Sequence, residues 1–231
     1  MTLPLYLALT AAEMAGIRSI PPQLAHMACH FSAYGTGLSN RPKWLPEGSM
    51  LILNDRIPIH GHDPDLICRQ LQETVTSLHC SSLLLDFQRL GCEETAILAR
   101  KLVGTLPCPV GLSQGYAEGI SCPVFLPPPP LDTPLSIYLA PWRDREIWLE
   151  AALDGVQLTL TSDGCESVFI PSPAISNGIA DEALHCHYRI QTAHDRVCFT
   201  LYRTREDLDE LMKEAAQQGV TQAIGLWQEL N

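Results

Sequence analysis

The chain has 231 residues, of which 46% are hydrophobic and 18% are charged, and its formal net charge is −11. This composition excludes a disordered acidic chain, and a surface of this sign repels phosphate backbones and anionic lipid heads. We therefore expect neither nucleic acid nor a membrane as a partner, and the length suits one large α/β barrel or two smaller domains.

Nine cysteines are spread along the sequence without a CxxC pair. A disulfide scaffold would show an even, tighter framework and a zinc site would show paired spacings, so reduced thiols in the core fit better. The apolar start lacks a basic region, and no run reaches transmembrane length. These features predict a soluble, cytoplasmic protein.

Eight short apolar runs, each bounded by glycine, proline or polar residues, predict buried strands. In chain order they cover residues 3–10, 25–31, 49–55, 81–89, 109–114, 122–126, 146–153 and 220–230. The seventh run is ambiguous between helix and strand. We interpret it as a strand because residues 154–155 are Asp-Gly and residues 156–161 then alternate as a strand that would pair with it.

Apolar residues at helical spacing predict three helices, at residues 65–78, 93–103 and 205–218, whereas no convincing helix separates the second and third strands. Residues 185–190 and 197–202 alternate around a turn and predict a β-hairpin. Four prolines at 127–130 predict a stiff extended connector, and residues 171–178 predict a loop.

This order of elements predicts an α/β fold: one (β/α)8 TIM-like barrel over residues 1–231, with several crossover helices reduced to loops and a β-hairpin inserted before the last helix and strand. Chemistry in such barrels lies where the strands end. The residues expected there are Tyr34, Asn54, Asp86, Gln88, Gln114, Glu150 and Trp227.

The C-terminal quarter reads Phe199-Thr-Leu-Tyr-Arg-Thr-Arg-Glu-Asp-Leu, a helix, and then Gly219-Val-Thr-Gln-Ala-Ile-Gly-Leu-Trp-Gln-Glu-Leu. These segments in this order resemble glycoside hydrolase family 18, the chitinase group, and are closest to its spore-germination and cortex type. The resemblance implies a family-18-like barrel in which Trp227 corresponds to a tryptophan that stacks against sugar.

The fourth strand departs from the Asp-x-x-Asp-x-Asp-x-Glu pattern of that family. Ser81, Leu84, Asp86 and Gln88 stand at its four acidic positions, so only the third acid is kept. The family mechanism needs the last of these as a general acid, and a glutamine cannot deliver a proton. The Tyr and Asp expected at the sixth strand are also absent, because this chain reads Val124-Phe-Leu-Pro127 there.

Each candidate also has a structural explanation. Asp86 and Gln88 share one face of the strand, yet Asp86 can be a buried acid satisfied by its neighbours. Glu150 is the best replacement acid, yet acids at strand ends are often paired or solvated. His60 and His62, like His185 and His187, have a spacing that suits metal ligands. Metal-dependent amidohydrolases with such a pair also need an Asp at the end of the last barrel strand, where this chain has Trp227 and Gln228. We expect no metal and no cofactor.

Three hypotheses follow. The first is a catalytically degenerate glycosidase-like protein, a pseudoenzyme, that binds a carbohydrate or small polar ligand through Tyr34, Asn54, Asp86, Gln88, Gln114 and Trp227. The second is an active, divergent glycoside hydrolase that uses Asp86 or Glu150 as its acid. The third is a protein-interaction scaffold with a vestigial site. Enzymatic activity and oligomeric state stay open.

Overall fold

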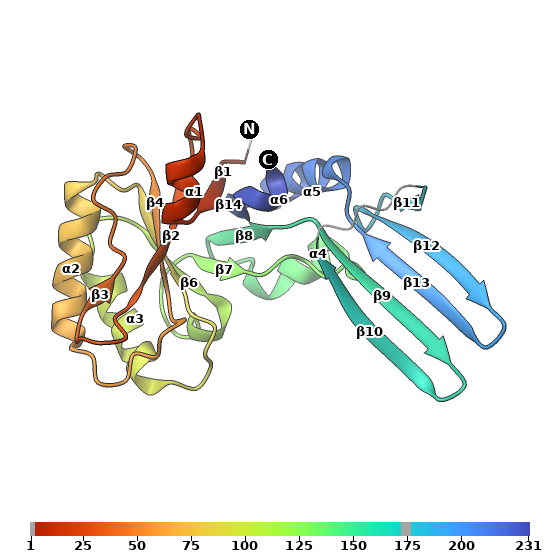
Figure 1. The fold of residues 1–231 in the computed structure, drawn as a ribbon, viewed down its shortest axis with the longest axis horizontal. Helices are drawn as coiled ribbons and strands as arrows, with labels where there is room; N and C mark the ends of the chain where they lie inside the picture. The colour runs from red at the N-terminus through yellow and green to blue at the C-terminus, as the bar shows by residue number, and fades with distance from the viewer. Residues whose placement is uncertain (1–2, 172–176) are drawn as a thin grey trace.

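Eight parallel strands close into a barrel in the computed structural model, which describes residues 3–171 and 177–231 (Figure 1). In order around the barrel they are β1 (Leu5–Leu9), β2 (Leu24–Phe31), β4 (Met50–Asn54), β5 (Ser82–Asp86), β6 (Val110–Ser113), β7 (Val124–Leu126), β8 (Ile147–Ala151) and β14 (Val220–Leu226). The pairing of β14 with β1 closes the ring. The predicted fold class and all eight predicted barrel strands are confirmed.

The crossovers between these strands carry fewer and shorter helices than a complete barrel. The helices are α1 (Ala11–Gly16), α2 (Pro64–Ser77), α3 (Glu93–Thr105), α4 (Leu135–Leu139), α5 (Arg205–Gln217) and α6 (Trp227–Leu230), with single 3₁₀ turns at Gln114–Tyr116 and Ala140–Trp142. The three predicted helices are confirmed as α2, α3 and α5. A two-residue strand, β3 (Leu38–Ser39), replaces a helix between β2 and β4.

Two apolar cores lie on the two sides of the barrel wall. The outer core packs between the strands and the helices. The inner core is smaller, and its lower end is filled by Trp148, which is fully buried. The indole fits there because Gly111 on the facing wall has no side chain: a Cβ at this position would lie 2.2 Å from the Trp148 ring. All nine cysteines are unpaired, and four of them are buried.

The end of the last strand differs from the prediction. β14 stops at Leu226, and Trp227 begins α6 instead of continuing the strand to residue 230. The cause is Gly225, where an added Cβ would lie 2.3 Å from Leu230. Because Gly225 leaves this space open, buried Leu230 folds back over the strand, and the chain turns into a helix.

A five-stranded antiparallel sheet is inserted between β8 and α5. Its strands are β9 (Asp154–Thr161), β10 (Gly164–Pro171), β11 (Ile179–Asp181), β12 (Cys186–Ala193) and β13 (Arg196–Tyr202), in the order β10-β9-β13-β12-β11. The predicted hairpin is confirmed as β12 and β13. The expected pairing of residues 156–161 with the seventh strand is wrong, because β9 pairs with β10 and β13. Most of the loop predicted at 171–178 lies outside the described residues.

This inserted sheet projects from the barrel as an arm, and α5 holds its root (Figure 1). His185 contacts Glu214 at 2.5 Å, and His187 contacts Asp207 at 2.7 Å. In the described part of the chain, no helix is long and apolar enough to cross a membrane.

Candidate functional site

A cavity of about 770 Å³ opens at the C-terminal ends of the barrel strands. Apolar side chains of the inner core make its floor: Ile52, Leu84, Phe125 and Ile224. Polar side chains from β2, β4, β5 and β8 and from the loops after β1, β3, β4 and β5 surround its opening: Thr10, His30, Asn40, Asn54, Asp55, Arg56, Asp86, Gln88, Arg89 and Glu150. An apolar floor below a few convergent polar groups is the usual composition of a small-molecule site, and the volume lies in the usual range.

Sheet register places three of these polar residues side by side. Asp86 of β5 pairs with Asn54 of β4, and Asn54 pairs with His30 of β2. The Asn54 amide donates to the carbonyls of Met27 and Cys29, both at 3.1 Å, where β2 has an irregular register. Asn54 therefore completes the hydrogen bonding of the β2 backbone and gives this part of the wall a fixed shape.

Asp86 is half-buried and points into the cavity beside Gln88. The Gln88 amide donates to its Oδ1 at 2.5 Å. Burial raises the pKa of Asp86 and the nearby charge of Asp55 adds to this, while the bond from Gln88 opposes it. The glutamine thus stabilises an ionised Asp86.

Asp55 positions the segment that carries Gln88. Its side chain is 3% exposed, and its two oxygens accept the backbone N–H groups of Gln88 at 2.9 Å and Arg89 at 2.8 Å. Arg89 in turn donates to the carbonyls of Asp55 and Arg56, both at 3.0 Å. Because these bonds run in both directions, they fix the loop after β5 against the loop after β4.

Glu150 enters the cavity from β8, on the other side of the opening. Burial raises its pKa to about 7, and the charges of Asp86, Asp154 and Glu229 contribute to the rise. In the residues that the structure describes, no hydrogen bond reaches its carboxylate. A half-buried carboxyl that is partly protonated near neutral pH can donate a hydrogen bond or a proton.

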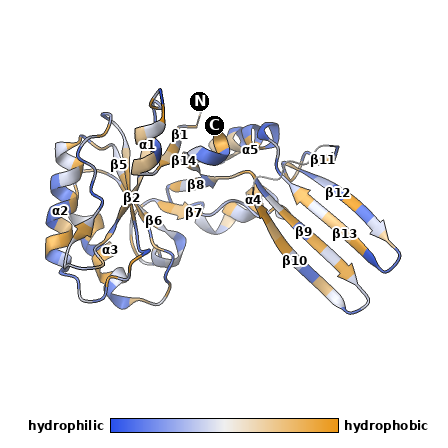
Figure 2. Cartoon of the chain, viewed as in Figure 1, coloured by the Kyte–Doolittle hydropathy of each residue, from blue (hydrophilic) through white to orange (hydrophobic). Residues whose placement is uncertain are grey.

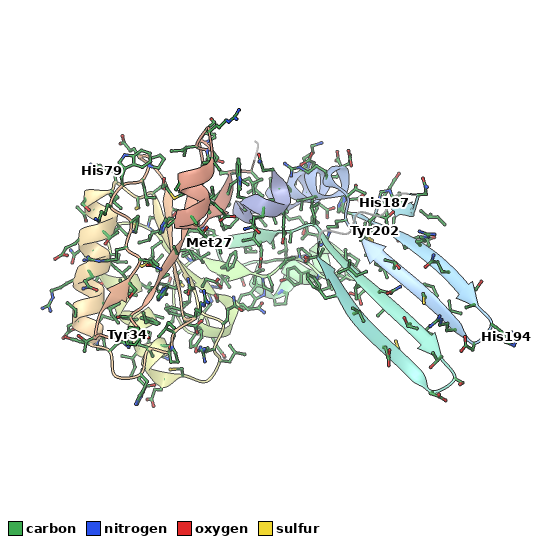
Figure 3. All side chains as sticks on the ribbon, in the orientation of Figure 1. Met27, Tyr34, His79, His187, His194 and Tyr202 are labelled. Carbon is green, nitrogen blue, oxygen red and sulfur yellow. The ribbon has the colours of Figure 1, made fainter. Side chains whose placement is uncertain are left out.

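The seven residues expected at the rim fall into two groups. Asn54, Asp86, Gln88 and Glu150 line the cavity together. Tyr34 is fully exposed in the loop between β2 and β3, and Figure 3 places it well away from Met27, which lines the cavity. Gln114 is exposed in a 3₁₀ turn, and neither it nor Trp227 is among the lining residues.

Trp227 is turned away from the cavity by the bend at Gly225. It is half-buried and packs against the outer core, so its ring lies outside the barrel wall. The prolines at 127–130 also do not line the cavity. Their carbonyls instead accept bonds from Tyr138 to Pro127 and from Arg203 to Pro129, both at 2.8 Å, so the opening is not blocked by this segment.

Sequence reasoning missed several lining residues. Asp55 and Arg89 are the last residues of predicted strands, and His30 is the last residue but one of β2, so the strand-end rule alone could have found them. Ala11 and Ala12 of α1 also line the cavity, but this short helix was not predicted.

The histidine pairs do not converge on a common centre. His62 contacts the carbonyls of Ile59 and Ser32, and His60 lies near Glu94. His185 and His187 contact α5 as described above. Across residues 3–171 and 177–231, no group of three or more His, Cys, Asp or Glu side chains is placed to hold a metal ion.

No protein-family model and no curated protein matches the sequence. Solved structures do match the fold. The spore cortex-lytic enzyme SleL of Bacillus cereus superposes with a TM-score of 0.58 at 12% identity, over 96% of this chain and 70% of that one. The chain has the fold of the glycoside hydrolase family 18 barrels. The resemblance inferred from the sequence is therefore confirmed as a likeness of fold.

Two further family-18 structures match over nearly their full length. The N-acetylglucosaminidase of Paenibacillus barengoltzii gives a TM-score of 0.58 at 10% identity, and the chitinase of Cycas revoluta in complex with (GlcNAc)3 gives 0.56 at 8%. Each covers 97% of this chain and 94% of its own. Within this family-18-like barrel, the cavity lies at the strand ends, where barrel enzymes place their chemistry.

Proposed function

We propose that this family-18-like barrel binds a carbohydrate at its mouth and does not cleave it by the family mechanism. One observation carries the proposal: the cavity brings Asn54, Asp86, Gln88 and Glu150 together, and the position of the missing proton donor is filled by an amide bonded to Asp86. The cavity thus offers polar groups to a ligand without the group that starts the family reaction.

The cavity suits a neutral sugar. Carboxylate and amide oxygens accept hydrogen bonds from sugar hydroxyls, and Phe125 offers an apolar surface at the floor to the C–H face of a ring. Three acids of the lining, Asp55, Asp86 and Glu150, are balanced by two arginines, Arg56 and Arg89, so the lining has no strong net charge that would select a charged ligand. Since the Cycas revoluta chitinase was solved with (GlcNAc)3, oligomers of N-acetylglucosamine are the first ligands to test.

The family reaction lacks two of its parts here. Gln88 can hydrogen-bond a glycosidic oxygen but cannot protonate it. The β7 segment Val124-Phe-Leu also offers no Tyr or Asp to steady an acetamido group. Restoring one acid at position 88 would therefore leave the acetamido group unsupported.

The test is isothermal titration calorimetry with (GlcNAc)3 on three proteins. Wild type binds, and Ala12→Trp, which places an indole at the cavity rim, weakens binding at least ~10-fold. Ala15→Trp is the matched control, because Ala15 is exposed on the same helix but does not line the cavity. Wild type that gives no heat and no thermal shift at millimolar sugar, or equal binding by both variants, contradicts the proposal.

A second candidate function is hydrolysis by Asp86 and Glu150. The observation that favours it is the pKa of Glu150, raised to about 7 beside a second carboxyl in the same cavity. Two carboxyl groups in one cavity, one of them partly protonated near neutral pH, are the requirement of a two-carboxylate glycosidase. Glu150 would donate the proton, and Asp86 would act as base or nucleophile.

Chromogenic β-glycosides of glucose and N-acetylglucosamine test this candidate. If Glu150 is the acid, Glu150→Gln lowers kcat at least ~10²-fold and removes an ionisation near pH 7 from the rate profile. Asp86→Asn lowers it comparably. Activity that survives both substitutions, or no activity in wild type, rules the candidate out. If the protein neither binds nor cleaves sugar, the hypothesis that remains is a protein-interaction scaffold with a vestigial site.

A further inference from the structure

The two faces of the inserted sheet differ sharply in chemistry. Register places thirteen side chains on one face beyond the root of the arm, and we call this the apolar face. They are Val156, Leu158, Leu160, Cys165, Ser167, Phe169, Ile179, Tyr188, Ile190, Thr192, Val197, Phe199 and Leu201. None of the thirteen is charged. The opposite face carries Glu166, Arg189 and Arg196 and many hydroxyl and amide groups, with Val168 and Ile170 as apolar residues of β10.

Nothing in the described part of the chain covers the apolar face. Phe169 is 64% exposed, Ile179 60% and Ile190 50%, six of the thirteen residues are half-buried, and none of the thirteen packs against either core. Figure 2 shows hydrophobic segments along β9, β10 and β13, where the sheet extends beyond the helices. α5 holds the opposite face at the root, where His187 stacks on buried Tyr202 (Figure 3).

The apolar face has the area of a stable interface. The thirteen side chains correspond to about 26 strand residues, and strands ~4.8 Å apart that rise ~3.3 Å per residue give them a flat projection of roughly 400 Å². Because side chains project from the sheet, the accessible area is larger than this projection and approaches the ~800 Å² per partner of a standard interface. Patches of this size on monomers are typically functional.

The lack of charge on the apolar face makes it self-complementary, which fits a second copy of this chain as the partner. Two copies of net charge −11 repel each other, so they can associate only through a surface where like charges do not meet. The apolar face meets this condition, since it has no charged residue and is as complementary to itself as to any other flat apolar sheet. A membrane surface fits less well, because anionic lipid heads repel a body of this charge.

We propose that the chain dimerises through the apolar faces of two inserted sheets, which pack into a β-sandwich with the two barrels on the outside. The contact is isologous, and the sheets lie ~10 Å apart. Leu158 and Phe199 are paired in adjacent central strands, so the two-fold axis passes near them. Edge-to-edge pairing of the exposed strand β10 is disfavoured, because it would leave both apolar faces in water. The proposal is independent of the proposed function.

Adjacent residues of β12 provide a matched test. Ile190 lies on the apolar face and Gln191 on the opposite face, and both are exposed. Ile190→Asp would place an unpaired charge in the sandwich, which is strongly unfavourable, whereas Gln191→Asp keeps its carboxylate in water. Because both positions are exposed in the single chain, neither variant should impair folding, and far-ultraviolet circular dichroism checks this.

Sedimentation velocity of the full chain, from low to high micromolar concentration, measures the result. We expect a dimer for wild type and for Gln191→Asp, and a dissociation constant at least ~10-fold higher for Ile190→Asp. Wild type that stays monomeric overturns the proposal, and co-sedimentation of that monomer with neutral or anionic vesicles would assign the face to lipid. A dimer equally tight in both variants also overturns it, because another surface would then hold the copies together.

Discussion

At the scale of single residues, Glu150 is the group whose environment is least favourable. It is half-buried, near three other acids, and has no hydrogen-bond partner among the described residues. An acid in this position destabilises the fold unless it is protonated or a ligand contacts it. Unfavourable placement of this kind is commoner at functional sites than elsewhere, which is consistent with a site at the barrel mouth.

Glu150 should make the stability of the chain depend on pH. Its pKa is about 7 in the folded chain against an ordinary 4.5, so between these values the folded state holds a proton that the unfolded state has lost. The free energy of unfolding therefore falls as pH rises through this window, by on the order of 3 kcal/mol in total. Glu150→Gln removes this loss, and urea denaturation from pH 5 to pH 8 should show the variant gaining on wild type.

Glu118→Gln serves as the control for this measurement, since Glu118 is exposed and does not line the cavity. It should follow the wild-type pH dependence. A constant difference between Glu150→Gln and wild type at every pH would show that Glu150 keeps the same pKa in both states, and would remove the argument for a neutral acid in the cavity.

Asp55 holds the loop after β5 in place, because its carboxylate accepts the backbone N–H groups of Gln88 and Arg89. In Asp55→Asn the side-chain NH₂ group faces one of these donors, so a buried hydrogen bond is lost. We expect a destabilisation of about 1–3 kcal/mol and faster hydrogen exchange of the Gln88 and Arg89 amides. Asp144→Asn, at an exposed turn, should change neither quantity. Unaltered exchange in Asp55→Asn would mean that the loop after β5 is held by other contacts.

The sequence predicted that the site lies at the C-terminal ends of the barrel strands, but it did not predict which of the residues there point into the cavity. Asp86, Gln88, Asn54 and Glu150 follow apolar runs directly, and the barrel brings such positions together. Tyr34 and Gln114 also follow strands, yet the chain has already left the barrel wall there, as a loop and a 3₁₀ turn. Side-chain periodicity holds inside a strand and gives no information beyond its end.

At the scale of elements, the fit of β6 against β8 closes the lower end of the barrel. Gly111→Ala would place a methyl group 2.2 Å from the Trp148 ring, which is fully buried and bonded to Glu146 at 3.1 Å. We expect a loss of about 1–3 kcal/mol in urea denaturation and an altered near-ultraviolet circular dichroism spectrum. Gly104→Ala is the control, because Gly104 lies in α3 with open space around it, and it should cause no loss.

An intact Trp148 signal and unchanged stability in Gly111→Ala would show that the barrel can expand at this point. The inner core would then be less tightly packed than the contact between Gly111 and Trp148 indicates.

It was harder to predict from the sequence which strands pair with each other than which residues form strands. Residues 156–161 have the alternation of a strand, and the preceding Asp-Gly suggested a hairpin with β8. Alternation identifies a strand with one apolar face but does not identify its neighbours, which here are β10 and β13. Likewise, the apolar residues of 220–230 suggested one long strand, and only the packing of Leu230 on Gly225 ends it at Leu226.

At the scale of the whole molecule, the chain consists of a closed barrel with its own two cores and an arm with almost none (Figure 1). The barrel satisfies its strand edges by closure, whereas the arm is one layer thick and has an edge strand on each side. A single-layer sheet with an apolar face gains stability when that face is covered. The arm is therefore the part of the molecule whose stability depends most on association.

The ionic-strength dependence of this association follows from where the charges lie. The proposed interface has no charged residue, while each copy has a net charge of −11, so the electrostatic contribution to dimerisation is repulsion between the two bodies. Salt screens this repulsion, since the Debye length falls from about 30 Å at 0.01 M to about 8 Å at 0.15 M ionic strength. The dissociation constant of the wild-type dimer should therefore fall roughly threefold or more over this range. Sedimentation velocity at the two ionic strengths measures it, with Ile190→Asp as the control, whose dissociation constant should stay at least ~10-fold above that of wild type in both. Weakening by salt would indicate an interface held by ion pairs, and the uncharged apolar face could then not be the contact.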